Sequence, residues 1–384
     1  MQAESFDLIV VGAGPAGSEA ARRGAQLGMH TLLLERRALP RPKLCGGWVS
    51  LGAQKLLGEP IPAALVEAAL TGVRLRYRGT HHAHSTASSY GALVDRGDFD
   101  AWLARRAQEA GARLRKGTAR TLDVSGSRPQ LIVDGAEYRA DAVVVATGAD
   151  GPLTGAIRPA DLPERSAIGL ECIVPARRVL SAELTPGEAE FDFSSVRTGF
   201  SWGIHHGERI YLGIGGLRSE KKAVLQGWEK HVKRYGLGRG TAKVRGHLIP
   251  CGGFPRSLGR GRALLAGDAA GFVDAFTGEG IALAILSGRL AAEVLAATTA
   301  TGACCVKAYT SRCDEAFGTD LKWSLRIKLL AMRAPRFLGA LCADSDLFAA
   351  YLKVFAGQID YSAFVAGAGR HVFGGFAGRL TRHS

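Results

Sequence analysis

The stretch Gly12 to Gly17, GAGPAG, has the GxGxxG spacing that can hold the pyrophosphate of a dinucleotide. In this spacing Gly12 permits a tight turn, and Gly14 lets the backbone come close to the phosphates. Gly17 allows the following helix to pack closely on a strand, and the N–H groups at the start of that helix face the negative charge. The motif alone is weak, so the elements around it decide whether it binds a ligand.

Two acids indicate which dinucleotide is bound. Glu35 ends the next apolar run, TLLLE, where it can accept a hydrogen bond from a ribose hydroxyl and disfavours the 2′-phosphate of NADP. Asp268 follows a strand-ending glycine in LLAGDAAG and suits a hydroxyl of the ribityl chain, which FAD has and NAD lacks. The turn at 277–280, TGEG, opens a helix whose N-terminal amides and dipole can stabilise charge on a reduced flavin. We therefore expect FAD; the plainer alternative for Asp268 is a lone buried aspartate.

Cys45 lies between a lysine and two glycines in LPRPKLCGGWVS. The seven cysteines show no CxxC or Cys/His ligand spacing, which argues against a disulfide framework and against a structural metal site. Three roles stay open for Cys45: the wall of a pocket, a proton donor in turnover, or an inert core residue. A thiol is a plausible acid, because cationic neighbours can bring the reference pKa of a thiol, about 8.5, towards neutral.

The surrounding elements supply the context that the glycine motif needs. Phe6–Val11 predicts a buried parallel strand, a helix is expected from Pro15 to about Leu27 with Gly28 ending it, and Thr31–Glu35 predicts the next strand. Together they form a βαβ unit of the usual length, about 30 residues. A second helix is expected to begin at a cap on Asp98 and to end near Gly111.

The rest of the chain alternates between short strands and helices. Strands are expected at 118–124, 130–134, 137–140, from 141 into a glycine turn at 151, and, in antiparallel alternation, over 168–217; helices are expected at 280–297 and from 309 onward. This order predicts an α/β fold, α+β overall. A Rossmann-like FAD-binding domain (1–75, 92–165 and 255–300) would be interleaved with a mixed or antiparallel-sheet substrate domain (76–91 and 166–254) and followed by a helical C-terminal region (301–384).

Composition limits the classes of partner. The 384 residues carry a formal net charge of +14, spread along the chain without a Lys/Arg-rich cluster, so nucleic acid is not expected. An anionic membrane surface, an acidic protein partner or a negatively charged substrate remains. The sequence contains no apolar run long enough to span a membrane and no secretion signal at its start, so we expect a cytoplasmic protein.

The series GxGxxG, VVVATGADG and LLAGDAAG followed by GEGI resembles the flavoproteins that include aromatic hydroxylases, flavin halogenases and geranylgeranyl reductases. RPKLCGG and VDRGDFDAWLARRAQEAGA are most similar to the geranylgeranyl reductase branch, and the resemblance covers nearly the whole chain. With the glycine turn, it implies an FAD site formed by Gly12, Gly14, Ala16, Gly17, Glu35, Arg36, Cys45, Gly46, Trp48, Arg96, Ala119, Asp268, Gly280 and Ile281.

The segment that resembles the substrate signature of this family, YxWxFP, departs from it. Phe200 replaces the tyrosine, Trp202 is retained, and Ile204 and His205 replace the last two residues. The change removes a phenol and adds a titratable group beside His206, so the isoprenoid substrate is not fixed by the resemblance. The plainer interpretation places both histidines on a surface hairpin. Residues 81–84, HHAH, are expected in an exposed loop rather than at a metal site.

Three functions are consistent with these residues. The first is an FAD-dependent reductase that adds hydrogen across C=C bonds of a prenyl-type or other hydrophobic substrate, with Cys45 or water as the proton source and Trp202 as a pocket wall. The second is a monooxygenase that hydroxylates an aromatic molecule or a protein side chain through a flavin C4a-hydroperoxide, with His205 or His206 as base. The third is a flavin-stabilised accessory protein without turnover.

Two further partners are expected. The sequence has no second glycine-rich nucleotide site, so NAD(P)H must bind transiently or a separate electron carrier must reduce the flavin. KWSLRIKLLAMRAPR carries cations at Lys322, Arg326, Lys328, Arg333 and Arg336 and no acid, so it could lie on the inner face of an anionic membrane or accept a lipid phosphate. The alternative is a helix that packs its apolar side on the protein and leaves its cations in solvent.

Overall fold

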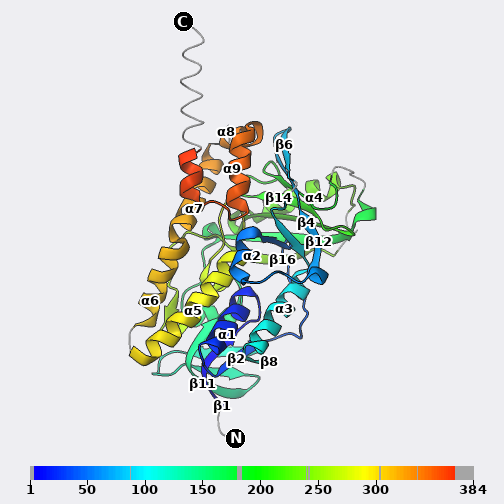
Figure 1. Cartoon of the computed structure of the whole chain (residues 1–384). Helices are drawn as coiled ribbons and strands as arrows, with labels where there is room; N and C mark the ends of the chain where they lie inside the picture. The colour runs from blue at the N-terminus through cyan, green and yellow to red at the C-terminus, as the bar shows by residue number, and fades with distance from the viewer. Residues whose placement is uncertain are drawn as a thin grey trace.

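The computed structural model describes residues 4–86, 88–179, 184–238, 240, 243–301, 304–334 and 336–367. Within these ranges the strands form one eight-stranded, one seven-stranded and one three-stranded sheet. Figure 1 shows the first sheet at the N-terminal end of the molecule and the last helices, α7 to α9, at the opposite end. The helix α5 (Ile281–Thr301) runs between these two ends.

The eight-stranded sheet forms the dinucleotide-binding body. Its main path is β17 (Gly259–Arg260), β18 (Ala263–Leu265), β11 (Ala136–Val145), β1 (Glu4–Val11), β2 (Thr31–Glu35) and β8 (Arg113–Lys116), with β10 (Gln130–Val133) and β9 (Ala119–Asp123) added beside β11. β1 is parallel to both β2 and β11. Leu8, Ile9 and Val10 are fully buried because helices cover the sheet. α1 (Pro15–Gln26) packs against α5 and α3 (Arg96–Glu109). Because α1 connects the parallel strands β1 and β2, the predicted βαβ unit is confirmed.

The seven-stranded sheet is antiparallel except at one pair. Its order is β16 (Arg245–Pro250), β12 (Ser166–Pro175), β15 (Arg209–Leu217), β14 (Phe200–His205), β13 (Glu188–Asp192), β5 (Gly72–Tyr77) and β6 (Thr80–Ser85). β13 and β5 run parallel, so a segment from early in the chain completes a sheet formed mainly by later residues. α4 (Lys221–Arg234) packs on β15. This arrangement confirms the predicted interleaving of a Rossmann-like fold with a mixed sheet.

A small sheet and the C-terminal helices connect the two bodies. The three-stranded sheet contains β3 (Trp48–Ser50), β7 (Gly91–Val94) and β4 (Val66–Leu70), and α2 (Leu51–Leu57) follows β3. The described C-terminal region is helical as predicted, with α6 (Cys305–Cys313), α7 (Thr319–Arg333), α8 (Arg336–Ala343) and α9 (Ser345–Phe355). Trp48 stacks on Phe355 with ring centroids 4.1 Å apart, and the N–H of Gly52 donates to the Ala356 carbonyl. The segment 48–52 and α9 therefore share one core.

Three sequence predictions about these elements were wrong. Asp98 does not cap α3: the cap is Asp95, whose side chain accepts from the N–H of Gly97, and Asp98 lies within the first turn. The strands expected separately at 137–140 and from 141 are one continuous strand, β11. Residues 81–84 lie in strand β6, because they pair with β5 at the edge of the sheet, and not in a loop.

The expected domain limits remain a proposal. The expected limit between residues 75 and 76 falls inside β5, so it divides one strand of the seven-stranded sheet between two domains. The C-terminal region was expected to extend to 384, and residues 368–384 lie outside the described part of the chain.

One helix has the length and composition of a membrane span. In α5 the window Ile281–Thr298 has a mean hydropathy of 1.6, and 61% of it is buried inside the protein. Because α5 packs against α1, α2 and α6, its apolar surface is explained by burial in the core of the dinucleotide-binding body.

Candidate active site

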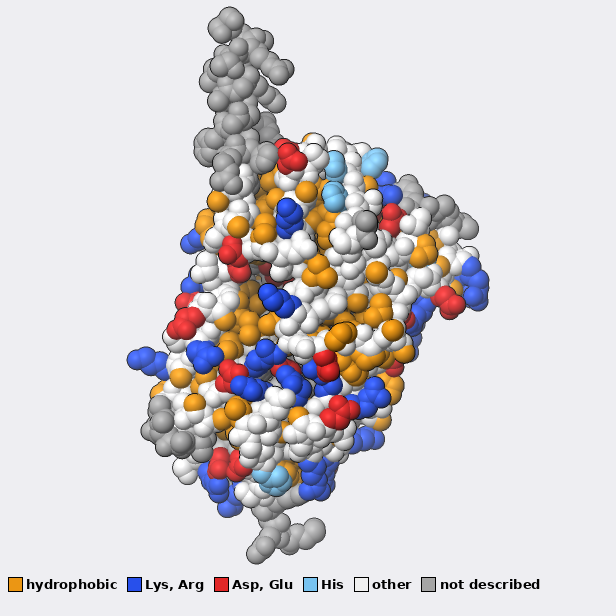
Figure 2. Space-filling model, in the orientation of Figure 1, with side chains coloured by type: hydrophobic (Ala, Val, Ile, Leu, Met, Phe, Trp, Pro, Cys, Tyr) orange, Lys and Arg blue, Asp and Glu red, His pale blue; other side chains and the backbone are white. Residues whose placement is uncertain are grey.

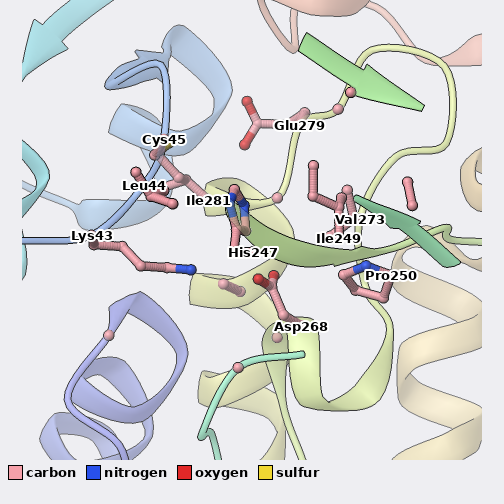
Figure 3. Close-up of a pocket in the computed structure, with 18 of the residues that line it drawn as sticks. Lys43, Leu44, Cys45, His247, Ile249, Pro250, Asp268, Val273, Glu279 and Ile281 are labelled. Carbon is pink, nitrogen blue, oxygen red and sulfur yellow. The ribbon is translucent and has the colours of Figure 1, made fainter. Parts of the chain in front are cut away.

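A cavity of about 440 Å³ lies where the two large sheets, the start of α5 and the C-terminal helices meet. Every residue predicted to bind the cofactor lines this cavity except Gly17, and the predicted catalytic residues Cys45 and Trp202 line it as well. His205 does not. Figure 3 shows part of the site, with Lys43, His247 and Asp268 pointing into the same space from three different segments.

The glycine turn has the close contacts that its sequence predicts. Gly12 has a φ of +105°, and a Cβ there would lie 2.4 Å from the Ala146 carbonyl oxygen. A Cβ on Gly17 would lie 1.7 Å from the Gly12 carbonyl oxygen, so Gly17 is a packing residue rather than a ligand contact. Gly14 is the N-cap of α1 and offers no capping side chain, which leaves the first N–H groups of α1 available to an anion at the cavity.

Glu35 lies at the end of β2 with 5% of its surface exposed. Its carboxylate accepts hydrogen bonds from the N–H groups of Ala13 and Arg37, both at 3.1 Å, and pairs with the Arg41 guanidinium at 3.0 Å. These contacts fix the carboxylate beside the glycine turn. The sequence analysis did not identify Arg41, because a single arginine in a loop gives no pattern to read.

Two more acids line the same cavity. Asp268 lies in the turn after β18, and its carboxylate makes no hydrogen bond or ion pair with any described residue. Glu279 precedes α5 and accepts from the N–H of Ala282 at 2.9 Å, so part of the α5 terminus is capped within the protein. Burial raises the pKa of Glu279, and the nearby Asp274 adds to the effect.

These observations fit FAD. A positive-φ glycine turn with free helix amides suits a pyrophosphate, a fixed acid at the end of β2 suits a ribose, and an unpaired acid in the turn after β18 suits a sugar-alcohol chain. A single cavity is lined by all three and by a set of aromatic side chains. The donors and acceptors therefore match the chemistry of this cofactor.

The Cys45 segment is fixed on both sides by buried groups. The N–H of Cys45 donates to Glu171 Oε1 at 3.2 Å, and the Gly46 carbonyl accepts from His206 Nε2 at 3.0 Å. His206 Nδ1 contacts the Glu67 carboxylate at 2.6 Å. Because a carbonyl oxygen can only accept, His206 Nε2 must donate to Gly46. One further proton lies between His206 Nδ1 and the Glu67 carboxylate. The hydrogen bonds from His206 and Arg209 lower the pKa of Glu67 against the effect of its burial.

Arg96 and Asp100 lie beside the same segment at the start of α3. Their side chains pair at 3.0 Å and both are buried. Burial opposes the charge on Arg96, but Asp100 and Cys45 outweigh it and raise the pKa of the guanidinium. A permanent cation therefore lies next to the Cys45 thiol.

The two histidines expected on a surface hairpin are buried instead, with 8% of His205 and 3% of His206 exposed. Trp202 and Ile204 line the cavity, whereas His205 is the next residue along β14 and points to the opposite face. The Nδ1 of His205 accepts from the N–H of Gly207, and burial lowers the pKa of the ring. The structure therefore does not bring His205 to Cys45 and Trp202.

Three functional candidates were missed by the sequence analysis: Glu171, His206 as a support for Gly46, and His247. Glu171 could have been noticed as an acid inside an otherwise apolar strand, GLECIV. His247 lines the cavity from β16, and burial together with Lys43 and Arg96 lowers its pKa to about 3. Only the pairing of distant strands brings these side chains to Cys45.

Comparisons with known proteins agree with this site. Residues 6–170 match the family model for pyridine nucleotide-disulphide oxidoreductases. The fold and site thus define an FAD-dependent oxidoreductase. The chain is 30% identical over 349 residues to digeranylgeranylglycerophospholipid reductase 1 of Methanothermobacter thermautotrophicus. The aligned region covers 84% of this chain and 85% of that relative. The chain belongs to the geranylgeranyl reductase family.

Two further similarities extend the comparison. Menaquinone reductase of Mycobacterium tuberculosis is 27% identical over 368 residues, which cover 87% of this chain and 86% of that protein. The solved structure of a geranylgeranyl bacteriochlorophyll reductase-like protein from Thermoplasma acidophilum has a TM-score of 0.79 at 22% identity and covers 95% of this chain and 98% of that chain. The structural similarity supports the fold over nearly the full length.

Proposed function

We propose that this enzyme reduces C=C bonds of a prenyl-type lipid. The observation that carries the proposal is an aromatic chamber that continues from the FAD site. Its walls come from β13, β14, the turn before α5, and α9, and they include Phe191, Phe193, Phe200, Trp202, Phe276 and Phe355. Such walls bind a long apolar chain and exclude water from the reacting bond. The names of the related reductases are consistent with this substrate class.

The residues divide into those that hold FAD and those that hold the substrate. Gly12, Gly14, Glu35 and Asp268 would bind the dinucleotide and its ribityl chain, with Ala16, Arg36, Cys45, Gly46, Trp48, Arg96, Ala119, Gly280 and Ile281 around them. When bound and reduced, FAD supplies a hydride. Trp202 orients the chain, and the Cys45 thiol supplies the accompanying proton beside the Arg96 cation.

The reductant and the location of the enzyme are part of the same proposal. We expect NAD(P)H or a separate electron carrier to reduce the flavin, and we expect a cytoplasmic protein that meets its lipid at the inner membrane face. On α7, Lys322, Arg326 and Arg333 are exposed, and Leu330 is 48% exposed. Figure 2 shows hydrophobic side chains across the middle of one face, with Lys and Arg side chains bordering them. Stronger binding to anionic than to neutral vesicles, lost at high salt, would support this location.

The test of the reaction is an anaerobic single turnover. Enzyme with pre-reduced FAD is mixed with a geranylgeranyl lipid, and the product is weighed by mass spectrometry. A gain of two hydrogens supports the reductase. Incorporation of oxygen when air is admitted, with no change under anaerobic conditions, would instead support the monooxygenase. An unchanged substrate in both arms would favour a flavin-stabilised accessory protein.

A further inference from the structure

A buried carboxyl group lies directly behind the cavity wall at Cys45. Glu171 is on β12, and 1% of its surface is exposed. Its Oε1 accepts from the N–H of Cys45, whereas its Oε2 has no hydrogen-bond partner among the described residues. A buried carboxyl oxygen without a partner is costly when the group is charged. The site therefore favours a proton on Glu171.

Trp202 lies on the other side of this carboxyl. Glu171 pairs with Gly213 across β12 and β15, and Trp202 pairs with Gly213 across β14 and β15. The three residues thus form one row on one face of the sheet. Since Gly213 has no side chain, the indole occupies the space above it, and its buried N–H has the Glu171 carboxyl as its polar neighbour, although the geometry falls short of a well-formed hydrogen bond. The carboxyl lies between two residues that line the cavity.

The charged groups around Glu171 act in opposite directions. Burial raises its pKa to about 7, while the N–H of Cys45, the charges of Lys43 and Arg96 and the indole of Trp202 oppose the rise. Tyr211 on β15 lies on the same face as Glu171, and Cys172 is the next residue along β12 on the opposite face. Their own pKa values are raised by burial, that of Cys172 to about 12, so neither carries a charge at neutral pH. Glu171 can therefore gain and lose a proton under working conditions.

The other acids and bases of the cavity have different constraints. Asp274 accepts from the N–H groups of Phe276 and Thr277 and from the Tyr361 hydroxyl, so it fixes a turn. Glu279 caps α5. His247, with its pKa near 3, is neutral at pH 7 and holds no acidic proton to give. Of these acids and His247, Glu171 is the one that accepts a hydrogen bond from Cys45.

We propose that Glu171 holds the proton consumed in the reduction and passes it to the cavity through Cys45. This inference rests on the proposed function. The two new C–H bonds of the product need one hydride and one proton, and reduced FAD is the two-electron donor. The S–H bond of Cys45 breaks to supply the proton, and Arg96 stabilises the thiolate. The O–H bond of Glu171 then breaks to restore the thiol, and the carboxylate takes its next proton from water. Because it acts through Cys45, Glu171 is a positioning residue.

The first experiment needs no substrate. The FAD-loaded enzyme is titrated from about pH 5 to about pH 9, and the infrared band of a protonated carboxyl is followed. In the wild type and in C172A, we expect a band that disappears with a midpoint near pH 7 as the pH rises. In E171Q this band should be absent. Glutamine keeps the acceptor for the Cys45 N–H but carries no acidic proton. If the wild type has no such band, or if E171Q retains it, the proposal is overturned.

The second experiment measures single turnovers with a geranylgeranyl lipid. E171Q should slow the step about 100-fold and flatten its pH profile, with FAD content unchanged. C172A, which changes the neighbouring residue on the opposite face of β12, should behave as the wild type. The double variant C45S/E171Q should be no slower than the slower of the two single variants, because both residues lie on one proton route. If the rate losses of the two single variants add up in the double variant, the proposed proton route from Glu171 through Cys45 is overturned. If no lipid is turned over, the proposed function fails, while the titration still shows whether Glu171 holds the proton.

Discussion

The indole of Trp202 lies across Gly213, so that a Cβ on Gly213 would come within 2.1 Å of the ring atom Cε2. The two residues pair across β14 and β15. A glycine on one strand thus sets how deeply the tryptophan of the next strand enters the aromatic chamber. The backbone of β15 is as much a part of the substrate site as the side chains that line it.

We expect G213A to push the indole into the chamber and to lower single-turnover rates with a geranylgeranyl lipid by about 100-fold, since small displacements of positioning groups are costly. FAD content should not change. G155A is the matched control, because a Cβ at Gly155 meets nothing within 4 Å. Equal rates for both variants would show that the position of Trp202 does not matter.

The Glu35 carboxylate should be needed for FAD affinity. E35Q weakens charge-assisted hydrogen bonds from Ala13 and Arg37 and the pair with Arg41, besides the contact to ribose. Losing a hydrogen bond to a charged group costs about 1.5–3 kcal/mol, so the Kd for FAD should rise about 10- to 100-fold. Equilibrium titration of apoprotein by flavin fluorescence measures it. An unchanged Kd would contradict the assignment of Glu35 as a cofactor residue.

Replacing the thiol should separate cofactor binding from turnover. We expect C45S to retain FAD, because the Cys45 N–H contact to Glu171 and the Gly46 carbonyl contact to His206 are preserved. Reduction of the substrate should be at least about 10-fold slower. The exposed Cys304 provides the control variant, C304S. Full turnover in C45S, measured anaerobically with pre-reduced enzyme, would leave Cys45 only as a pocket wall.

Acid should destabilise the fold through His231. Burial lowers the pKa of His231 to about 4, although its Nε2 hydrogen bond to the Trp202 carbonyl opposes the shift. The unfolded chain binds a proton near pH 6.5 and the folded chain does not, so this stability is complete above pH 6.5 and is lost as the pH falls towards 4. The loss amounts to about 3 kcal/mol for this residue.

The variant H231Q keeps an N–H for the Trp202 carbonyl but cannot titrate. Its free energy of unfolding, from denaturant series at several pH values, should depend less on pH between about 4 and about 6.5. Glu171 acts with the opposite sign: its raised pKa means that stability is lost as the pH rises from about 4.5 to about 7. An H231Q slope equal to that of the wild type would contradict the role given to His231.

Much of the first body could be predicted because its signals are local. The apolar run Phe6–Val11, the glycine turn and Glu35 are contiguous, and a strand, a turn and a helix follow from neighbouring residues. Asp268 was predicted from its place after a strand-ending glycine, and the resemblance to flavoproteins placed Cys45 at the FAD site; both residues line the cavity. The boundaries were less reliable, since Asp95 and Asp98 are both good caps and tertiary packing chooses between them.

The groups that support Cys45 could not be predicted in the same way. Glu171 is 126 residues from Cys45 and His206 is 160 residues from Gly46, so only the register of β12 and the end of β14 brings them together. The positions of His205 and His206 depended on strand alternation. A shift by one residue exchanges the two faces, and sequence alone did not determine that register.

Because Trp48 stacks on Phe355, the aromatic chamber can be completed only after α9 has been synthesised. A chain emerging from the ribosome has its nucleotide-binding turn complete long before α9 is made, and until then Trp48 has no aromatic neighbour at residue 355. A chain that stopped before α9 would therefore lack Phe355 and the wall that α9 gives to the aromatic chamber.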